Sequence, residues 1–150
     1  MRTLIQRVSR ASVSIRGGDK KETGPGLLIF LGIEEADNEQ DVQWLCKKIS
    51  GLRIFDDESG VMNLSVKNID GDAMIISQFT LHASTKKGNR PSYIRAASAG
   101  KAIPLYEQFI SGMEEALGKP VTTGKFGAMM DVELVNSGPV TIGIDSRDRE

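Results

Sequence analysis

The sequence has 150 residues, of which 39% are hydrophobic and 26% charged, with a formal net charge of −1 and one cysteine. A chain of this length buries a self-sufficient core, so we expect a single domain over residues 1–150. It has no run of about 20 apolar residues, as a transmembrane helix requires, and charges at Arg2, Arg7 and Arg10 interrupt any signal peptide. The single Cys46 excludes an internal disulfide and indicates a reducing, cytoplasmic location. With one histidine there is no zinc cluster, and we expect no metal and no cofactor.

The first half of the chain is predicted to begin with strands. Leu4–Val8 and Val13–Ile15 alternate in hydrophobicity, which is typical of one or two half-buried strands. The glycines and proline of residues 17–26 indicate a turn. The continuous apolar run Leu27–Ile33 predicts a central strand covered on both faces. Asp37 is then the expected cap of a helix whose apolar residues recur at spacings of three and four, namely Val42, Leu45, Ile49 and Leu52.

The second half is predicted to alternate strands, one long loop and a helix. A turn at 56–60 precedes a short strand at 61–66, and Ala73–Leu81 is the strongest strand prediction in the chain. A long loop follows, then a helix over Ile103–Leu117 with Pro104 in its first turn and Gly118 after its end. Residues 128–144 are expected to close the sheet. The predicted fold is therefore α+β, with a mostly antiparallel, barrel-like sheet and two helices packed on it.

The charge of the chain is unevenly distributed. Ala73–Tyr106 contains no Asp or Glu, whereas its basic residues are His82, Lys86, Lys87, Arg90, Arg95 and Lys101. A basic face on a neutral protein is a candidate phosphate-binding surface. The alternative is a solvated loop that happens to be basic.

The side chains offer one weak catalytic pair. On a strand, Thr80 and His82 share a face and would be read as nucleophile and base. No third group near them in the sequence orients the histidine, so an ordinary sheet surface is the competing and preferred interpretation. Cys46 lies among the apolar positions of the first helix and is interpreted as core packing.

Gly138-Pro139 interrupts the last strand-forming segment. Val132–Val135 and Val140–Ile144 both alternate with period two, yet proline cannot donate to a ladder between them. A break there leaves backbone carbonyls without strand partners, and a cis bond would turn them to one side. Two such carbonyls can accept from an ammonium group. A backbone site of this kind recognises the α-carbon and its amine and does not recognise the side chain. It could therefore distinguish the mirror images of many amino acids.

Six segments, in order and spanning nearly the whole chain, resemble one family. They are LIQRVSRASV (4–13), GPGLLIFLGI (24–33), SQFTL (77–81), KGNRPSY (87–93), FGAMMDVELVN (126–136) and NSGPVT (136–141). Together they resemble the D-aminoacyl-tRNA deacylases. The pair SQFTL and NSGPVT is highly specific, whereas either alone is only suggestive. One departure is Ser137, where the family usually has Asp.

The resemblance implies an activity and an assembly. The family hydrolyses the ester between a D-amino acid and the 3′-terminal adenosine of tRNA, and its members are homodimers with two active sites near the interface. Gly138-Pro139 matches a Gly-cis-Pro motif that reaches into the partner's pocket and excludes L-amino acids through the backbone. Such a gate cannot strongly reject glycine, so glycyl-tRNA is a further expected substrate.

The resemblance also assigns roles to residues. The adenosine and ester end of the pocket is lined by Ser77, Gln78, Phe79 and Thr80, and the Phe79 and Thr80 N–H groups are expected to hold the ester carbonyl as its charge develops. Catalysis is expected to rely on the 2′-hydroxyl of the tRNA, which assists attack by water. The residues expected around the amino acid are Arg7, Met129, Asn136, Gly138 and Pro139, with Arg7 orienting the Gly-Pro segment. Contacts to acceptor-stem phosphates are expected from Lys86, Lys87 and Arg90.

Three alternatives stay open at this point. The first is a dimeric nucleic-acid-binding protein without hydrolytic activity, although phosphate binding requires neither SQFTL nor NSGPVT. The second is a small-ester or amide hydrolase that uses Thr80 and His82. The third is a structural domain in which Gly138-Pro139 is only a trans turn.

Overall fold

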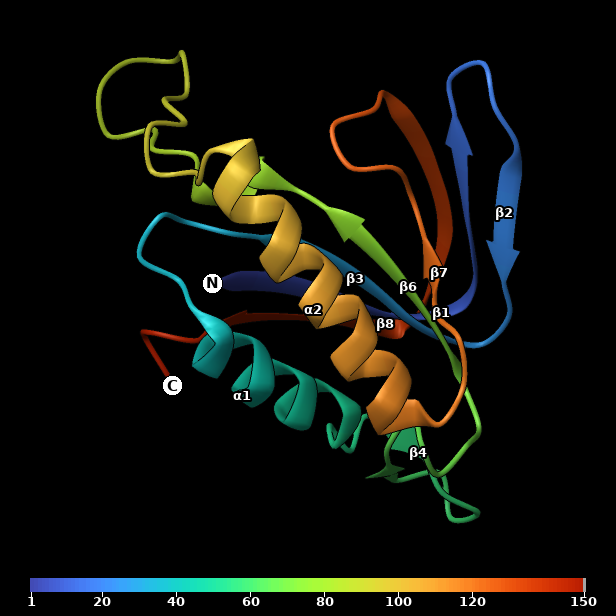
Figure 1. Cartoon of the computed structure of the whole chain (residues 1–150). Coiled ribbons are helices and arrows are strands. Elements are labelled where there is room, and N and C mark those ends of the chain that lie inside the picture. Colours follow the sequence, from blue (N-terminus) through green and yellow to red (C-terminus); the bar gives the residue numbers. More distant parts are fainter. Residues whose placement is uncertain (150) are drawn as a thin grey trace.

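The computed structural model describes residues 1–149 and shows one curved sheet covered by two helices (Figure 1). The elements, in chain order, are β1 (Arg2–Ile15), β2 (Lys20–Thr23), β3 (Gly26–Gly32), α1 (Glu39–Ser50), β4 (Phe55–Asp56), β5 (Met62–Leu64), β6 (Asp72–Ser77), a 3₁₀ helix (Phe79–His82), α2 (Ala99–Leu117), β7 (Thr122–Thr123) and β8 (Met130–Asp145). The predicted α+β class with two main helices is confirmed.

The sheet is organised around β1. The strand order is β2-β1-β3-β6-β7, and β8 pairs with the other edge of β1. β1 is antiparallel to β2, β3 and β8, whereas the β3–β6 and β6–β7 pairings are parallel, so the sheet is mixed. β1 pairs with β3 through its first half and with β2 through its second half, while β8 follows it over nearly its whole length. The sheet therefore curls into a nearly closed barrel.

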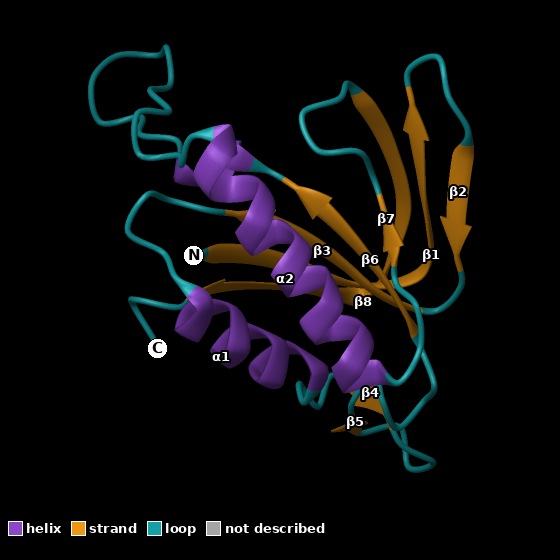
Figure 2. Cartoon of the chain, in the orientation of Figure 1, coloured by secondary structure: helices purple, strands orange, loops and turns teal. Residues whose placement is uncertain are grey.

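Both helices pack on one face of this sheet (Figure 2). Their apolar sides, which include Leu45, Ile49 and Phe109, join a core formed with alternate residues of β1 and β3. A smaller cluster on the other face is enclosed where β1 and β8 curl over, and it includes Val13, Leu28 and Met74. β3 is buried on both faces, as the continuous apolar run predicts. Among the described residues, no helix is long and apolar enough to cross a lipid bilayer.

Two predicted helix starts are wrong by one and four residues. α1 is capped by Asn38, whose side chain accepts from the Gln40 N–H at 2.9 Å, in a capping box. Asp37 is buried instead, and its Oδ1 accepts from the Met1 ammonium at 2.6 Å. α2 begins at Ala99, so Pro104 lies inside it and not in its first turn. The turn predicted at 17–26 also contains a short strand, β2.

Candidate active site

The chain leaves the sheet at Ser77, so the strand predicted to run to Leu81 is four residues too long. The Gln78 N–H still donates to the Leu31 carbonyl at 2.8 Å, and a 3₁₀ helix begins at Phe79. This turn lies directly against Gly32 at the end of β3. A Cβ at Gly32 would lie 3.0 Å from the Gln78 carbonyl oxygen and 3.1 Å from His82 Cδ2. The missing side chain of Gly32 therefore lets the turn pack close to the sheet.

This turn disrupts the face that Thr80 and His82 were predicted to share. His82 points into the protein with 1% of its surface exposed, and neither ring nitrogen has a hydrogen-bond partner among the described residues. Burial lowers its pKa. The Thr80 hydroxyl accepts a hydrogen bond from the Gln78 side-chain amide. The structure thus shows no contact that would activate Thr80 through His82.

Two backbone donors are left free by the same turn. The Leu81 N–H donates to the Gln78 carbonyl and the Ala83 N–H to the Thr80 carbonyl. Within residues 1–149, the N–H groups of Phe79 and Thr80 donate to no other group, as expected at the start of a helical turn. A pair of adjacent, unengaged N–H groups is a suitable site for a developing oxyanion.

A hollow of about 320 Å³ lies beside these donors. Its residues come from the ends of β3 and β6, the start of the 3₁₀ helix, the start of α2, and the first part of β8 with the segment before it. They include Ser77, Gln78, Phe79, Phe126, Met129 and Val132. Three predicted pocket residues, Ser77, Gln78 and Phe79, thus meet the predicted wall residue Met129. Thr80 is next to the hollow in the chain but does not line it. The lining is largely apolar, which suits a nucleoside base or an amino-acid side chain.

The Gly138-Pro139 segment forms a bulge in β8. Asn136 pairs with Val8 and Thr141 pairs with Gln6, so four residues of β8 lie opposite Arg7 alone. The predicted strand break is therefore an insertion within one long strand, which accommodates a proline without ladder hydrogen bonds. Gly138 has a φ of +116°, a conformation that favours glycine, and its bond to Pro139 is cis.

Side chains on both sides of the bulge fix its backbone. Arg7 Nε donates to the Ser137 carbonyl at 2.9 Å, and its Nη1 donates to the Ile54 carbonyl at 2.7 Å. Across the base of the bulge, Asn136 Nδ2 donates to the Thr141 hydroxyl at 2.8 Å. Asn136 Oδ1 accepts from the Val140 N–H at 3.1 Å. Gly138 and Pro139 are left exposed at the tip.

The bulge and the hollow are separate in one chain. None of the residues that line the hollow belongs to the bulge. Met130 and Gly138 are eight positions apart in β8, which corresponds to up to about 26 Å of strand at 3.3 Å per residue. The predicted site residues therefore form two separate groups in this chain, one around Phe79 and one around Gly138.

The predicted phosphate contacts lie on a projecting loop beyond the end of β6 (Figure 1). The loop is closed by a pair of hydrogen bonds between Ser84 and Ser92, and Lys86, Lys87 and Arg90 lie between them, exposed. None of these three cations forms an ion pair within residues 1–149. They are available to an external anion. Sequence reasoning missed Tyr93 on the same loop, whose ring contacts Phe79 at a centroid distance of 5.1 Å.

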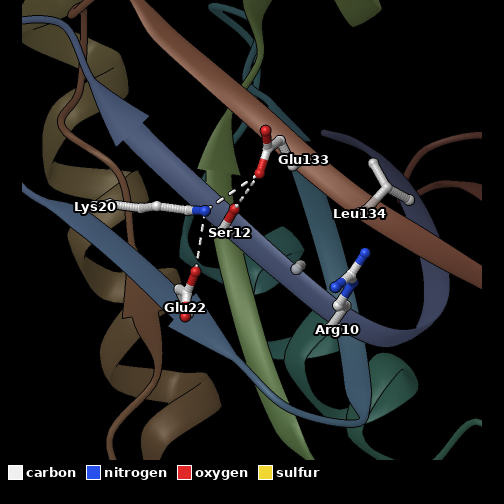
Figure 3. A pocket seen from close by; sticks show the side chains of 7 residues that line it. Arg10, Ser12, Lys20, Glu22, Glu133 and Leu134 are labelled. Atoms are coloured by element: carbon white, nitrogen blue, oxygen red, sulfur yellow. Dashed lines mark hydrogen bonds and ion pairs between the residues drawn. The ribbon is translucent and has the colours of Figure 1, made fainter.

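A second hollow, of about 300 Å³, lies on the outer surface of β1, β2 and β8 (Figure 3). There the Lys20 ammonium bridges Glu22 at 3.0 Å and Glu133 at 3.3 Å, and Ser12 donates to Glu133 at 3.3 Å. These carboxylates, Glu22 first, raise the pKa of Lys20. Lys20, Glu22 and Glu133 neutralise one another, and no predicted site residue lines this hollow. We interpret it as a surface ion-pair cluster.

Cys46 is part of the core, as predicted. It is buried against α2, its Sγ lies 3.6 Å from the Phe109 carbonyl oxygen, and burial raises the pKa of the thiol to about 12. A thiol in this state is not nucleophilic at neutral pH.

The family model and the named relatives agree on one family for this chain. The family model of D-Tyr-tRNA(Tyr) deacylase matches residues 4–145. Proteins named D-aminoacyl-tRNA deacylase from Bacteroides fragilis and Bacteroides thetaiotaomicron are 61% and 59% identical to this chain over the full length of both sequences. A solved structure titled c-Myc DNA Unwinding Element Binding Protein superimposes with a TM-score of 0.89 at 36% identity, covering 97% of this chain and 98% of that one. This chain therefore belongs to the D-Tyr-tRNA(Tyr) deacylase family.

Proposed function

We propose that this protein hydrolyses the ester bond of D-aminoacyl-tRNA and releases free D-amino acid and tRNA. The observation that carries the proposal is the pair of unengaged N–H groups of Phe79 and Thr80 beside the hollow, in a chain of this family. The terminal adenosine and the ester occupy the hollow near Ser77 and Gln78. As water attacks the ester carbon, negative charge develops on the carbonyl oxygen, and the two N–H groups donate to it.

No side chain of the pocket supplies a strong base, so we assign that part of the chemistry to the substrate. His82 is buried and Thr80 has no base beside it. The 2′-hydroxyl of the terminal ribose lies next to the esterified 3′-oxygen and assists the attacking water. The ester carbon–oxygen bond then breaks, and the 3′-oxygen takes a proton as it leaves. Thr80 contributes its backbone and not its hydroxyl as a nucleophile.

Selection against L-amino acids is assigned to the bulge of a partner protomer. The bulge is exposed, is fixed by Arg7 and Asn136, and lies apart from the hollow of its own chain. In a homodimer, Gly138 and Pro139 of one protomer complete the pocket of the other. Contact is made by backbone atoms, so the gate excludes an L-side chain by position and accepts many D-side chains. Glycine has no side chain to exclude, and glycyl-tRNA is a further substrate.

The loop cations position the tRNA. Lys86, Lys87 and Arg90 bind phosphates of the acceptor stem, which makes affinity fall with salt. The protein acts in the cytoplasm, without a metal or cofactor. The basic loop and the solved structure at 36% identity favour a second candidate, a dimeric nucleic-acid-binding protein without hydrolytic activity. A protein that only binds nucleic acid does not require the free N–H groups of Phe79 and Thr80 beside an apolar hollow.

The backbone assignment is tested by comparing Phe79→Pro with Phe79→Ala. Both variants lose the aromatic ring, but only proline removes the N–H, and position 79 is the first residue of a helical turn, where proline is tolerated. Loss of one such donor lowers kcat by about 10²- to 10³-fold. We expect that difference between the two variants on D-tyrosyl-tRNA at equal unfolding midpoints. Equal activity of both variants would contradict the assignment.

A further inference from the structure

Two exposed aromatic side chains lie beside the hollow: Phe79 lines it, and Tyr93 contacts Phe79. Phe79 and Tyr93 expose 56% and 40% of their surface, and their rings meet edge to face with an interplanar angle of 76°. The chain has eight aromatic residues, and the other six are buried or half-buried. Clustered exposed apolar side chains often mark a binding surface. We call Phe79 and Tyr93 the aromatic ledge.

The backbone of the ledge is fixed even though its side chains are exposed. Phe79 begins the 3₁₀ helix beside the hollow. On the other side, Tyr93 directly follows Ser92, which exchanges two hydrogen bonds with Ser84 at 2.8 and 2.9 Å, and the Tyr93 carbonyl accepts from the Ala96 N–H at 3.0 Å. The rings are thus presented at a defined position, which lowers the conformational cost of binding.

The ledge lies between two features that a single-stranded nucleic acid would contact in succession. Phe79 lines the hollow, and Tyr93 ends the basic loop that carries Lys86, Lys87 and Arg90. The surrounding segment, Ala73–Tyr106, contains no carboxylate that would repel a phosphate. An aromatic surface next to a cationic one is the usual combination in sites for unpaired nucleotides, because bases stack on rings while phosphates meet the cations.

We propose that the aromatic ledge stacks the unpaired base that precedes the terminal adenosine of the tRNA. This rests on the proposed function, in which the hollow holds the terminal adenosine. The nucleotide that precedes the adenosine then lies outside the hollow, against Phe79 and Tyr93, and its phosphate faces the loop cations. The rings are almost perpendicular, so one ring offers its face to the base and the other its edge. Stacking is indifferent to base identity, and the ledge therefore holds the strand without reading its sequence.

The test uses substrates that differ by one nucleotide. D-tyrosyl-adenosine lacks the preceding base, the D-tyrosyl ester of a dinucleotide has it, and D-tyrosyl-tRNA has the whole stem. Tyr93→Ala is compared with Tyr93→Phe, which keeps the ring, and with Ile94→Ala, which removes a neighbouring side chain that is 89% exposed. We expect Tyr93→Ala to raise KM about 5- to 150-fold for the dinucleotide ester and the tRNA, as loss of one stacked base predicts. The adenosine ester and both control variants stay within about twofold of the wild type.

Three results would overturn the proposal. An equal loss on D-tyrosyl-adenosine would place Tyr93 in the adenosine pocket, and unchanged KM on all three substrates would remove the ledge from binding. A change in oligomeric state of Tyr93→Ala would show that the ledge covers a second copy of the chain. Binding of the dinucleotide without its amino acid, measured by titration calorimetry, separates this proposal from the proposed function. Weaker binding by Tyr93→Ala supports the ledge even if the wild type cleaves no D-ester.

Discussion

Replacing Gly138 with alanine tests the physical basis of the bulge. Gly138 has a φ of +116°, and an added Cβ would overlap the Arg7 guanidinium at Nη2. The first effect is backbone strain, about 1–3 kcal/mol for a non-glycine residue in a sparsely populated region. The second is displacement of Arg7, which donates to the Ser137 carbonyl at 2.9 Å. A hydrogen bond from a charged donor contributes about 1.5–3 kcal/mol.

The two effects do not add fully, because the end of an arginine side chain can move. Arg7 is also held at the Ile54 carbonyl, so its movement has a cost of its own. We therefore expect Gly138→Ala to lower the free energy of unfolding by about 2–4 kcal/mol, within the range of the separate strain and hydrogen-bond costs.

Gly143→Ala is the matched control within the same strand. Gly143 is exposed, its φ is not positive, and a Cβ there has nothing within 4 Å. Urea unfolding of both variants, with deacylation of D- and L-tyrosyl-tRNA, measures stability and selectivity together. Gly143→Ala should match the wild type in both. A Gly138→Ala variant as stable and as selective as Gly143→Ala would refute the role given to this glycine and to Arg7.

Three further predictions follow from other parts of the structure. Thr80→Ala should retain most deacylase activity, because its backbone N–H remains; a loss of kcat comparable with the Phe79→Pro effect would restore Thr80 as nucleophile. Asp37→Asn should destabilise the fold by about 3–5 kcal/mol in thermal or urea unfolding, because it leaves the buried Met1 ammonium without its anion. The lowered pKa of His82 means that, as pH falls below its ordinary value of 6.5, the unfolded chain binds a proton that the folded chain does not. Stability should therefore fall on acidification, and unfolding midpoints at about pH 7.5 and 5.5 should differ less for His82→Gln than for the wild type.

The elements that sequence predicted well are those in which burial and periodicity agree. β3 is buried on both faces and reads as a continuous apolar run, and α1 carries its apolar residues at helical spacing. Strand pairing was harder to predict from the sequence, because the parallel pairing of β3 with β6 depends on a crossover connection and not on a local pattern. β7 is two residues long and has no periodicity to detect.

The candidate site was predicted less completely than the fold, for identifiable reasons. The apolar residues of Ala73–Leu81 continue past Ser77, whereas the close packing of the 3₁₀ turn against Gly32 involves another strand that the local sequence does not reveal. The partner of Arg7 at Ile54 lies 47 residues away, and no local pattern indicates it. Tyr93 could have been noticed as an aromatic residue at the end of a polar, basic loop.

The measurement that bears most directly on the central claim is parallel deacylation of D-tyrosyl-tRNA and L-tyrosyl-tRNA by the wild-type protein. The account predicts rapid loss of the D-ester, with the L-ester decaying at its spontaneous rate. Equal cleavage of both esters would contradict the chirality gate at Gly138-Pro139. Cleavage of neither ester, with tight binding of tRNA or DNA, would contradict the hydrolase itself and favour the nucleic-acid-binding protein.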